Sequence, residues 1–128
     1  MEKKIISTAA ILGMIAIVLG AFGAHALKKV LNLNELSTFE TGVKYQMYHA
    51  LFLLFIGTTT LVSENAKKTI CYLVVIGIIL FSGSLYLFAI NSLISINFKA
   101  IGFVTPIGGL LLILAWLVLL FNILKKKG

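Results

Sequence analysis

The sequence has little charge, and almost none of it is negative. Eleven lysines and four glutamates are its only charged residues, without any arginine or aspartate, and the formal net charge is +7. Hydrophobic residues make up 60% of the chain, whereas soluble domains use roughly 45–50%. This composition excludes an ordinary soluble domain and indicates a protein embedded in lipid. The lysines lie at the ends of apolar runs, where basic residues meet anionic headgroups, so we expect no nucleic-acid binding.

Cysteine and proline occur once each. Cys71 excludes an internal disulfide and a metal site built on paired cysteines, and it begins an apolar run, which favours a packing role. Pro106 lies in the last apolar run. It allows two interpretations, a helix kinked at Pro106 or a helix that is capped by Thr105 and begins at Pro106.

Four apolar runs are long enough to cross a membrane as helices. They cover about residues 5–24, 45–62, 70–90 and 101–124, and about twenty residues at 1.5 Å each span a hydrocarbon core of roughly 30 Å. The sequence therefore predicts an all-α polytopic membrane protein with four transmembrane helices in a small bundle. Residues 1–128 form one integral membrane domain, because no repeat, low-complexity segment or linker divides them.

The first run has a rival interpretation as a secretory signal peptide. Lys3 and Lys4 precede it, and Ala24, His25 and Ala26 have the small-x-small pattern of a cleavage site. The run is longer than the usual signal core of about 7–15 residues, and it carries a seam of small residues typical of helices that pack in lipid. Both features argue for a retained helix.

Small or weakly polar residues fall on one face of three of the runs. At 100° per residue they predict seams where helices pack closely. The seams consist of Gly13, Ala16 and Gly20 along the first run, Gly77, Ser84 and Asn91 along the third, and Gly102, Pro106 and Gly109 along the fourth.

The first loop is expected to be partly helical. Residues 27–31 carry apolar side chains at helical spacing beside two lysines, which predicts an amphipathic, interfacial helical segment. Residues 32–36 resemble a break. Ser37 and Glu40 have the spacing of a capping box, so the second helix is expected to begin there and to run to about Val62.

Polar, aromatic and ionisable side chains gather at the start of the second helix. With one histidine from the first run they form a candidate interaction cluster: His25, Glu40, Lys44, Tyr45, Gln46, Tyr48 and His49. Glu40 and His49 are nine residues apart, which places them on opposite faces of a helix and excludes a catalytic couple within it. We expect the cluster to lie at the external interface where the first two helices meet, with His49 facing the first helix.

The lysines predict the orientation of the chain. Four spans put both termini on one side, with seven lysines there and four on the other. The seven are Lys3, Lys4, Lys67, Lys68, Lys125, Lys126 and Lys127, and the four are Lys28, Lys29, Lys44 and Lys99. The positive-inside rule therefore predicts cytoplasmic N- and C-termini.

Four blocks of sequence resemble a known family. They are residues 19–26 (LGAFGAHA), 39–50 (FETGVKYQMYHA), 81–86 (FSGSLY), and 105–109 (TPIGG) with Trp116. In this order, and over essentially the whole chain, they are similar to the small four-helix membrane proteins of domain of unknown function family 423, also called uncharacterised protein family 0382, with YwdK-like and YgdD-like members. The resemblance implies a multi-pass protein of the bacterial plasma membrane. It implies no established activity and no catalytic residues.

Three functions remain open. The favoured one is a non-catalytic accessory or interaction protein that contacts the lipid bilayer and forms a homo-oligomer or part of a larger membrane complex. The alternative is a small oligomeric transporter or proton conductor that uses His25, His49 and Glu40. The third is a membrane enzyme acting on lipid, which only the interfacial cluster supports. Two histidines and one glutamate fall short of the four ligands of a closed zinc site, so we expect no metal and no other cofactor.

Overall fold

The structure is a computed structural model that describes residues 2–91, 93–94 and 98–125. Within these ranges the chain forms four α-helices and one short 3-10 helix, without any strand. The elements are α1 (Glu2–His25), η1 (Leu27–Lys29), α2 (Leu33–Thr58), α3 (Glu64–Ala89) and α4 (Phe98–Lys125). The predicted all-α fold with four helices is confirmed.

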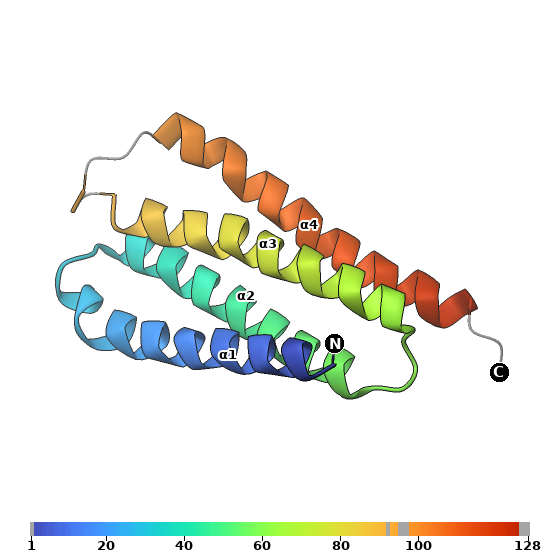
Figure 1. Ribbon diagram of the computed structural model, residues 1–128. Coiled ribbons are helices and arrows are strands. Elements are labelled where there is room, and N and C mark those ends of the chain that lie inside the picture. The colour runs from blue at the N-terminus through green and yellow to red at the C-terminus, as the bar shows by residue number, and fades with distance from the viewer. Residues whose placement is uncertain (1, 92, 95–97, 126–128) are drawn as a thin grey trace.

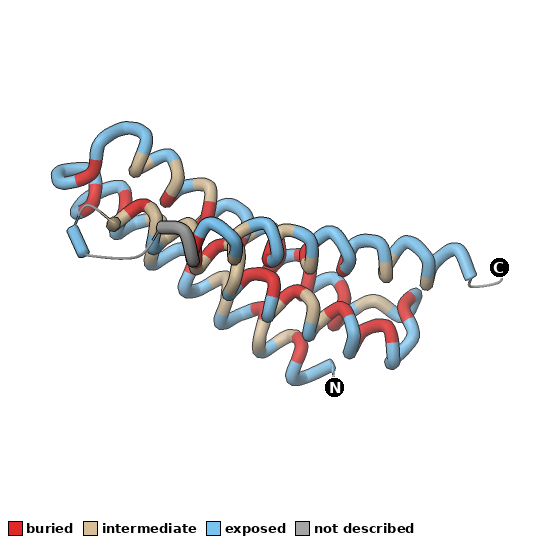
Figure 2. The backbone as a smooth tube through the Cα atoms, turned by 90° about the horizontal axis from the view of Figure 1, so that it is seen from above, coloured by how far each residue is buried: buried red, intermediate tan, exposed pale blue. Residues whose placement is uncertain are grey.

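The helices pack in the order in which they follow one another along the chain. The main contacts join α1 to α2, α2 to α3, and α3 to α4, so α1 and α4 lie at the two edges of the bundle (Figure 1). The start of α1 and the end of α4 lie at the same end of the bundle. Figure 2 shows long exposed stretches along α4 and buried positions where helices meet. The inner helices α2 and α3 thus each pack on two helices, whereas each outer helix packs mainly on one.

Three of the helical segments are long and apolar enough to cross a membrane. They cover Glu2–Lys29, Glu64–Ala89 and Ile101–Lys125. α2 is not among them, because the polar residues of its first half lower its hydropathy. Its 26 residues still amount to about 39 Å of helix, more than the hydrocarbon core requires. A crossing by α2, and with it the count of four spans, stays a prediction.

α2 begins earlier than the sequence predicted, with Asn32 as its N-cap. The Asn32 side chain accepts a hydrogen bond from the backbone N–H of Glu35 (2.8 Å), and the Glu35 carboxylate accepts one from the backbone N–H of Asn32 (3.0 Å). The predicted capping box at Ser37 and Glu40 is therefore wrong. The same spacing occurs five residues earlier, and residues 32–36, expected to be a break, open the helix.

The connection between α2 and α3 also lies elsewhere than predicted. α2 ends at Thr58 rather than near Val62, and α3 begins at Glu64 rather than at Ile70. Ser63 caps α3, since its hydroxyl accepts a hydrogen bond of 3.3 Å from the backbone N–H three residues on. Most of the polar residues expected to form a link are thus the first turns of α3.

α4 continues through Pro106, which lies inside the helix. The interpretation in which Thr105 caps the helix and Pro106 begins it is wrong. The Thr105 hydroxyl instead donates within the helix to the carbonyl oxygen of Ile101 (3.4 Å).

Two buried apolar clusters lie toward opposite ends of the bundle. The larger one includes Ile5, Leu53, Ile70 and Leu112, contributed by all four helices. The smaller one contains Leu27, Leu31, Phe39 and Ala89, so that η1, the helical segment predicted in the first loop, packs onto the ends of α2 and α3. Between these clusters lie most of the buried polar side chains, Gln46, His49, Ser82 and Ser84.

One close approach of two backbones fixes α4 against α3. A Cβ atom added to Gly108 would lie 2.9 Å from the carbonyl oxygen of Gly77 and would also meet the backbone at Phe81. Only glycine allows α4 to pack so near α3 at this point. The predicted seam included Gly77 but named Gly109 where the closest contact involves Gly108.

Candidate functional site

Gln46 joins three helices through its side-chain amide. The residue is only 4% exposed. Its Nε2 donates a hydrogen bond to the carbonyl oxygen of Leu12 in α1 (2.8 Å), and its Oε1 accepts one from the Tyr86 hydroxyl of α3 (2.7 Å). In a medium without water each such bond satisfies a group that would otherwise be costly to bury. The amide is therefore a central polar link of the bundle.

A second link between α2 and α3 lies one turn away, at Gly42. The Ser82 hydroxyl donates to the carbonyl oxygen of Gly42 (2.8 Å). The Tyr86 ring packs directly on Gly42, where an added Cβ would lie 2.6 Å from a ring carbon. Gly42 thus gives Tyr86 the space to reach Gln46, and the two links form one polar layer.

His49 joins α2 to α4, and the structure defines its tautomer. The indole Nε1–H of Trp116 lies 3.1 Å from Nε2 of His49, and Nδ1 of His49 lies 2.8 Å from the backbone carbonyl oxygen of Tyr45. An indole nitrogen can only donate and a carbonyl oxygen can only accept. Nε2 is therefore the acceptor and Nδ1 carries the proton, so His49 is a neutral imidazole with both nitrogens engaged.

The aromatic surroundings of His49 show which helix it faces. Its ring meets those of Phe52 and Trp116 edge-on, each with centroids 6.1 Å apart, and Phe52 stacks on Trp116 with centroids 4.0 Å apart. The prediction that His49 faces the first helix is wrong, because its partner belongs to α4. Gln46, one turn earlier, makes the contact with α1 instead.

A cavity of about 380 Å³ opens beside His49. It lies between α2, α3 and α4 and is mostly apolar. Its lining residues are Tyr45, His49, Phe81, Gly109, Leu112, Ile113 and Trp116. The lining side chains with polar atoms are Tyr45, His49 and Trp116. The Tyr45 and Phe81 rings lie with their centroids 5.2 Å apart.

The structure divides the predicted interaction cluster into separate groups. Gln46 and His49 are buried, whereas His25, Glu40, Lys44, Tyr45 and Tyr48 are exposed. His49 lies sixteen residues after Leu33, or about 24 Å along α2, so it belongs to the middle of the bundle rather than to the end where α2 begins. Glu40 and Lys44 line a different cavity, between α1 and α2.

The described part of the chain brings no three His, Cys, Asp or Glu side chains together in a group that could hold a metal.

The predicted seams are placed as follows. Gly13 and Gly20 face α2, where added Cβ atoms would lie 3.7 Å from Ala50 and 3.6 Å from Val43, and Ala16 is 1% exposed. Gly77 faces Leu112 of α4, and the Ser84 hydroxyl shares a short hydrogen bond with Thr105. Gly109 lies beside the Phe81 ring and Gly102 beside that of Phe88. Pro106 is exposed, and the side-chain oxygen of Asn91 is buried without a hydrogen-bond partner among the described residues.

One ion pair of a buried lysine was not predicted from the sequence. The Lys67 side chain is 2% exposed, and its Nζ lies 3.1 Å from Oε1 of Glu2, joining the first turns of α1 and α3. A lysine just before an apolar run ordinarily lies in the interface. Tyr86 and Trp116 were also not identified as partners, although a Tyr hydroxyl or Trp N–H within an apolar run signals that a polar partner is near.

Comparisons with known proteins agree on one family. The family model described as "Protein of unknown function (DUF423)" matches residues 19–109. A UPF0382 membrane protein of Staphylococcus saprophyticus is 40% identical over 96% of this chain and 98% of its own length. UPF0382 membrane protein YwdK of Bacillus subtilis is 38% identical (96% and 98% covered), and UPF0382 inner membrane protein YgdD of Escherichia coli is 36% identical (94% and 90%). No solved structure matches.

Proposed function

Because this chain is a membrane protein that belongs to the DUF423 (UPF0382) family, we propose that it acts as a non-catalytic interaction protein of the bacterial plasma membrane. The observation that carries the proposal is that the interior polar groups of Gln46 and His49 are occupied by hydrogen bonds within the bundle. Both ends of the Gln46 amide and both nitrogens of His49 are engaged by other helices or by the backbone. Such groups stabilise a scaffold and leave little polar chemistry free for a reaction.

The outer faces of the scaffold supply the surface for a partner. α4 packs mainly on α3, and its opposite side exposes large apolar residues, among them Phe103, Leu110 and Leu117. Lipid covers such a face in a monomer, and a helix of another membrane protein covers it in a complex. Because helix association in lipid depends on close packing, a bulky substitution on this face weakens a complex and leaves the fold intact.

The test is the mass of the intact complex. The tagged protein is extracted in native lipid particles and weighed beside two double variants. Leu110→Trp with Leu117→Trp enlarges the α4 face, and Ile11→Trp with Val18→Trp is the matched control on the exposed side of α1. We expect another membrane protein to co-purify with this chain in fixed stoichiometry. The α4 double variant should lose this partner, and the α1 double variant should keep it. A protein that is always found alone, or always as the same homo-oligomer, contradicts the proposal.

The proposed arrangement has four spans, with both termini in the cytoplasm. The placement of the start of α1 and the end of α4 at one end of the bundle (Figure 1) is consistent with an even number of crossings. Cysteines introduced singly in a Cys71→Ser background test it. A reagent that cannot cross the membrane should label position 34, beside the start of α2, and not position 60, between α2 and α3. Labelling of both from the same side contradicts a crossing by α2.

A second candidate, conduction of protons or a small solute, draws on the cavity beside His49. The proposal of an interaction protein expects no flux through it, because His49 must give up a hydrogen bond before it can move a proton. Vesicles containing the purified protein are the test. A flux that His49→Ala abolishes and Tyr48→Phe preserves would replace the first proposal with the second.

A further inference from the structure

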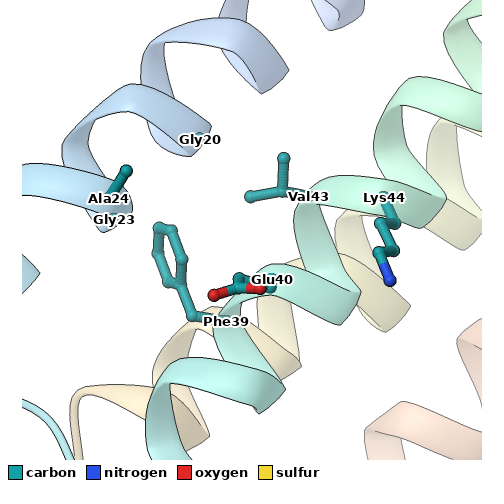
Figure 3. A pocket seen from close by; sticks show the side chains of 7 residues that line it. All are labelled: Gly20, Gly23, Ala24, Phe39, Glu40, Val43 and Lys44. Atoms are coloured by element: carbon teal, nitrogen blue, oxygen red, sulfur yellow. The ribbon is translucent and has the colours of Figure 1, made fainter. Parts of the chain in front are cut away.

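Two neighbouring cavities lie along one side of the α1–α2 pair, and we call them together the furrow. Near the end of α1 it forms a cavity of about 350 Å³, bounded by Gly20, Gly23 and Ala24 on α1 and by Glu40 and Lys44, among others, on α2. Figure 3 shows the small residues of α1 facing Phe39, Glu40 and Val43 across this space. It differs from the cavity beside His49, which α2 forms with α3 and α4.

The furrow continues toward the other end of the bundle as an apolar channel. A second cavity, of about 270 Å³, lies between the same two helices and includes Ala10 and Ile17 of α1 with Met47 and Leu54 of α2. Ala10, Ile17 and Ala24 follow one another at seven-residue intervals, as do Glu40, Met47 and Leu54. Residues at this interval share a helix face, so both cavities open on the same side.

The mouth of the furrow carries one charge of each sign. Glu40 and Lys44 are exposed and lie one turn apart on α2. Neither joins an ion pair of the described residues, where the ion pairs involve Lys67, and in Figure 3 their charged groups are not turned toward each other. Glu40 is level with Ala24, the penultimate residue of α1. An acidic and a basic group thus stand at the end of an apolar channel, close to where the helix leaves the lipid.

We propose that this furrow binds one phospholipid whose headgroup bears both a phosphate and a primary ammonium, as phosphatidylethanolamine does. The Glu40 carboxylate accepts hydrogen bonds from the ammonium, the Lys44 ammonium donates to the phosphate, and an acyl chain lies along Gly20, Gly13 and Leu54. Fourteen residues separate Glu40 from Leu54, about 21 Å of helix, which exceeds the roughly 15 Å depth of one leaflet.

The charges distinguish this lipid from others. The quaternary ammonium of a choline headgroup cannot donate a hydrogen bond to Glu40, and a purely anionic headgroup is repelled by Glu40 while it is attracted by Lys44. A second copy of the chain is the other occupant that the apolar channel admits, and the retention experiment below separates it from a lipid. The inference does not depend on the proposed protein partner.

Lipid retention tests the proposal on the whole protein. The purified chain is exposed to equal amounts of palmitoyl-oleoyl phosphatidylethanolamine, phosphatidylcholine and phosphatidylglycerol, and the lipids that stay bound are counted by native mass spectrometry. One phosphatidylethanolamine should be retained, about tenfold over phosphatidylcholine, as expected of one charge-assisted hydrogen bond. Glu40→Gln should remove this preference, and Lys44→Gln should lower retention of all three lipids.

Matched variants control for charge and for folding. Glu64→Gln and Lys28→Gln change the same charges at other exposed positions and should retain phosphatidylethanolamine as the unaltered protein does. Gly20→Ala is accommodated, since its Cβ would meet only Val43 at 3.6 Å, whereas Gly20→Leu should block the furrow and release the lipid.

Two results overturn the proposal. One is the absence of a specific preference: the protein retains phosphatidylethanolamine and phosphatidylcholine equally and Glu40→Gln changes nothing, or the control variants change lipid retention as much as Glu40→Gln and Lys44→Gln do. The other is a protein dimer without bound lipid that Gly20→Leu dissociates, which assigns the furrow to a second copy.

Discussion

α2 and α4 are the two extremes of this bundle. α4 has a mean hydropathy of 2.6 over its most apolar stretch, of which 17% is buried. α2 does not reach the apolarity of a candidate span, and it carries Gln46 and His49 in its interior face. α2 lies between α1 and α3, whereas α4 packs mainly on α3 (Figure 1). A polar side chain is tolerated at membrane depth where neighbouring helices supply hydrogen-bond partners. A helix that packs mainly on one neighbour exposes most of its surface to lipid, and that surface has to be apolar.

The largest expected effect comes from forcing α4 away from α3. Gly108→Leu places a side chain against the backbone of α3, which cannot move aside, so we expect a loss of about 3 kcal/mol or more in the free energy of unfolding. Gly83→Ala is the control, because its added Cβ has no neighbour within 4 Å and alanine favours a helix. The measurement is unfolding by denaturing detergent in mixed micelles. Equal stability of the two variants would show that the Gly108 contact is not tight.

Removal of the central amide should have the next largest effect. Gln46→Leu leaves the Tyr86 hydroxyl without its acceptor and cuts the bond to α1. Interhelical hydrogen bonds in membranes contribute about 0.6 kcal/mol on average and rarely more than about 1.7. Because two such bonds are removed, we expect the free energy of unfolding to fall by about 1–2 kcal/mol. Tyr48→Leu, two residues away and 54% exposed, should change stability much less. An unchanged Gln46→Leu protein would mean that α2 does not depend on its polar partners.

The smallest effect concerns the hydrogen bond between Trp116 and His49, which joins α4 to α2. Trp116→Phe keeps an aromatic ring stacked on Phe52 but removes the indole N–H that donates a hydrogen bond to His49. We expect the free energy of unfolding to fall by about 0.6 kcal/mol, measured in the same unfolding assay, with Tyr48→Phe as the matched control. A loss as large as that of Gln46→Leu would indicate that α4 depends on polar contacts as much as α2 does.

The sequence predicts the helices better than it predicts what they face. Length and apolarity are enough to identify α1, α3 and α4 as helices, because every turn that contacts lipid has to be apolar, although the polar first turns of α3 lie outside its apolar run. The start of α2 was misplaced because Asn32 with Glu35 and Ser37 with Glu40 have the same spacing of a capping residue and a glutamate, and the spacing alone does not choose between them. Periodicity shows which residues share a face, but not which neighbour that face meets.

His49 illustrates this limit. Its position on the same face as Gln46 was readable, since three residues separate them. A broad polar face, however, can touch α1 at one residue and α4 at the next turn, and the order of packing decides which. Trp116, the only tryptophan, was the available signal, because its N–H in an apolar run needs an acceptor.

The tautomer of His49 tests most directly whether the interior polar groups are satisfied by one another. His25→Gln leaves His49 as the only histidine, so nitrogen NMR of ring-labelled protein in lipid reports on it alone. We expect a neutral ring at neutral pH, with the proton on Nδ1 and with Nε2 accepting a hydrogen bond from Trp116, and a shift of the Nε2 resonance in Trp116→Phe. A ring protonated on Nε2, whether as the other tautomer or as imidazolium, would contradict the account and return His49 to consideration as a proton carrier.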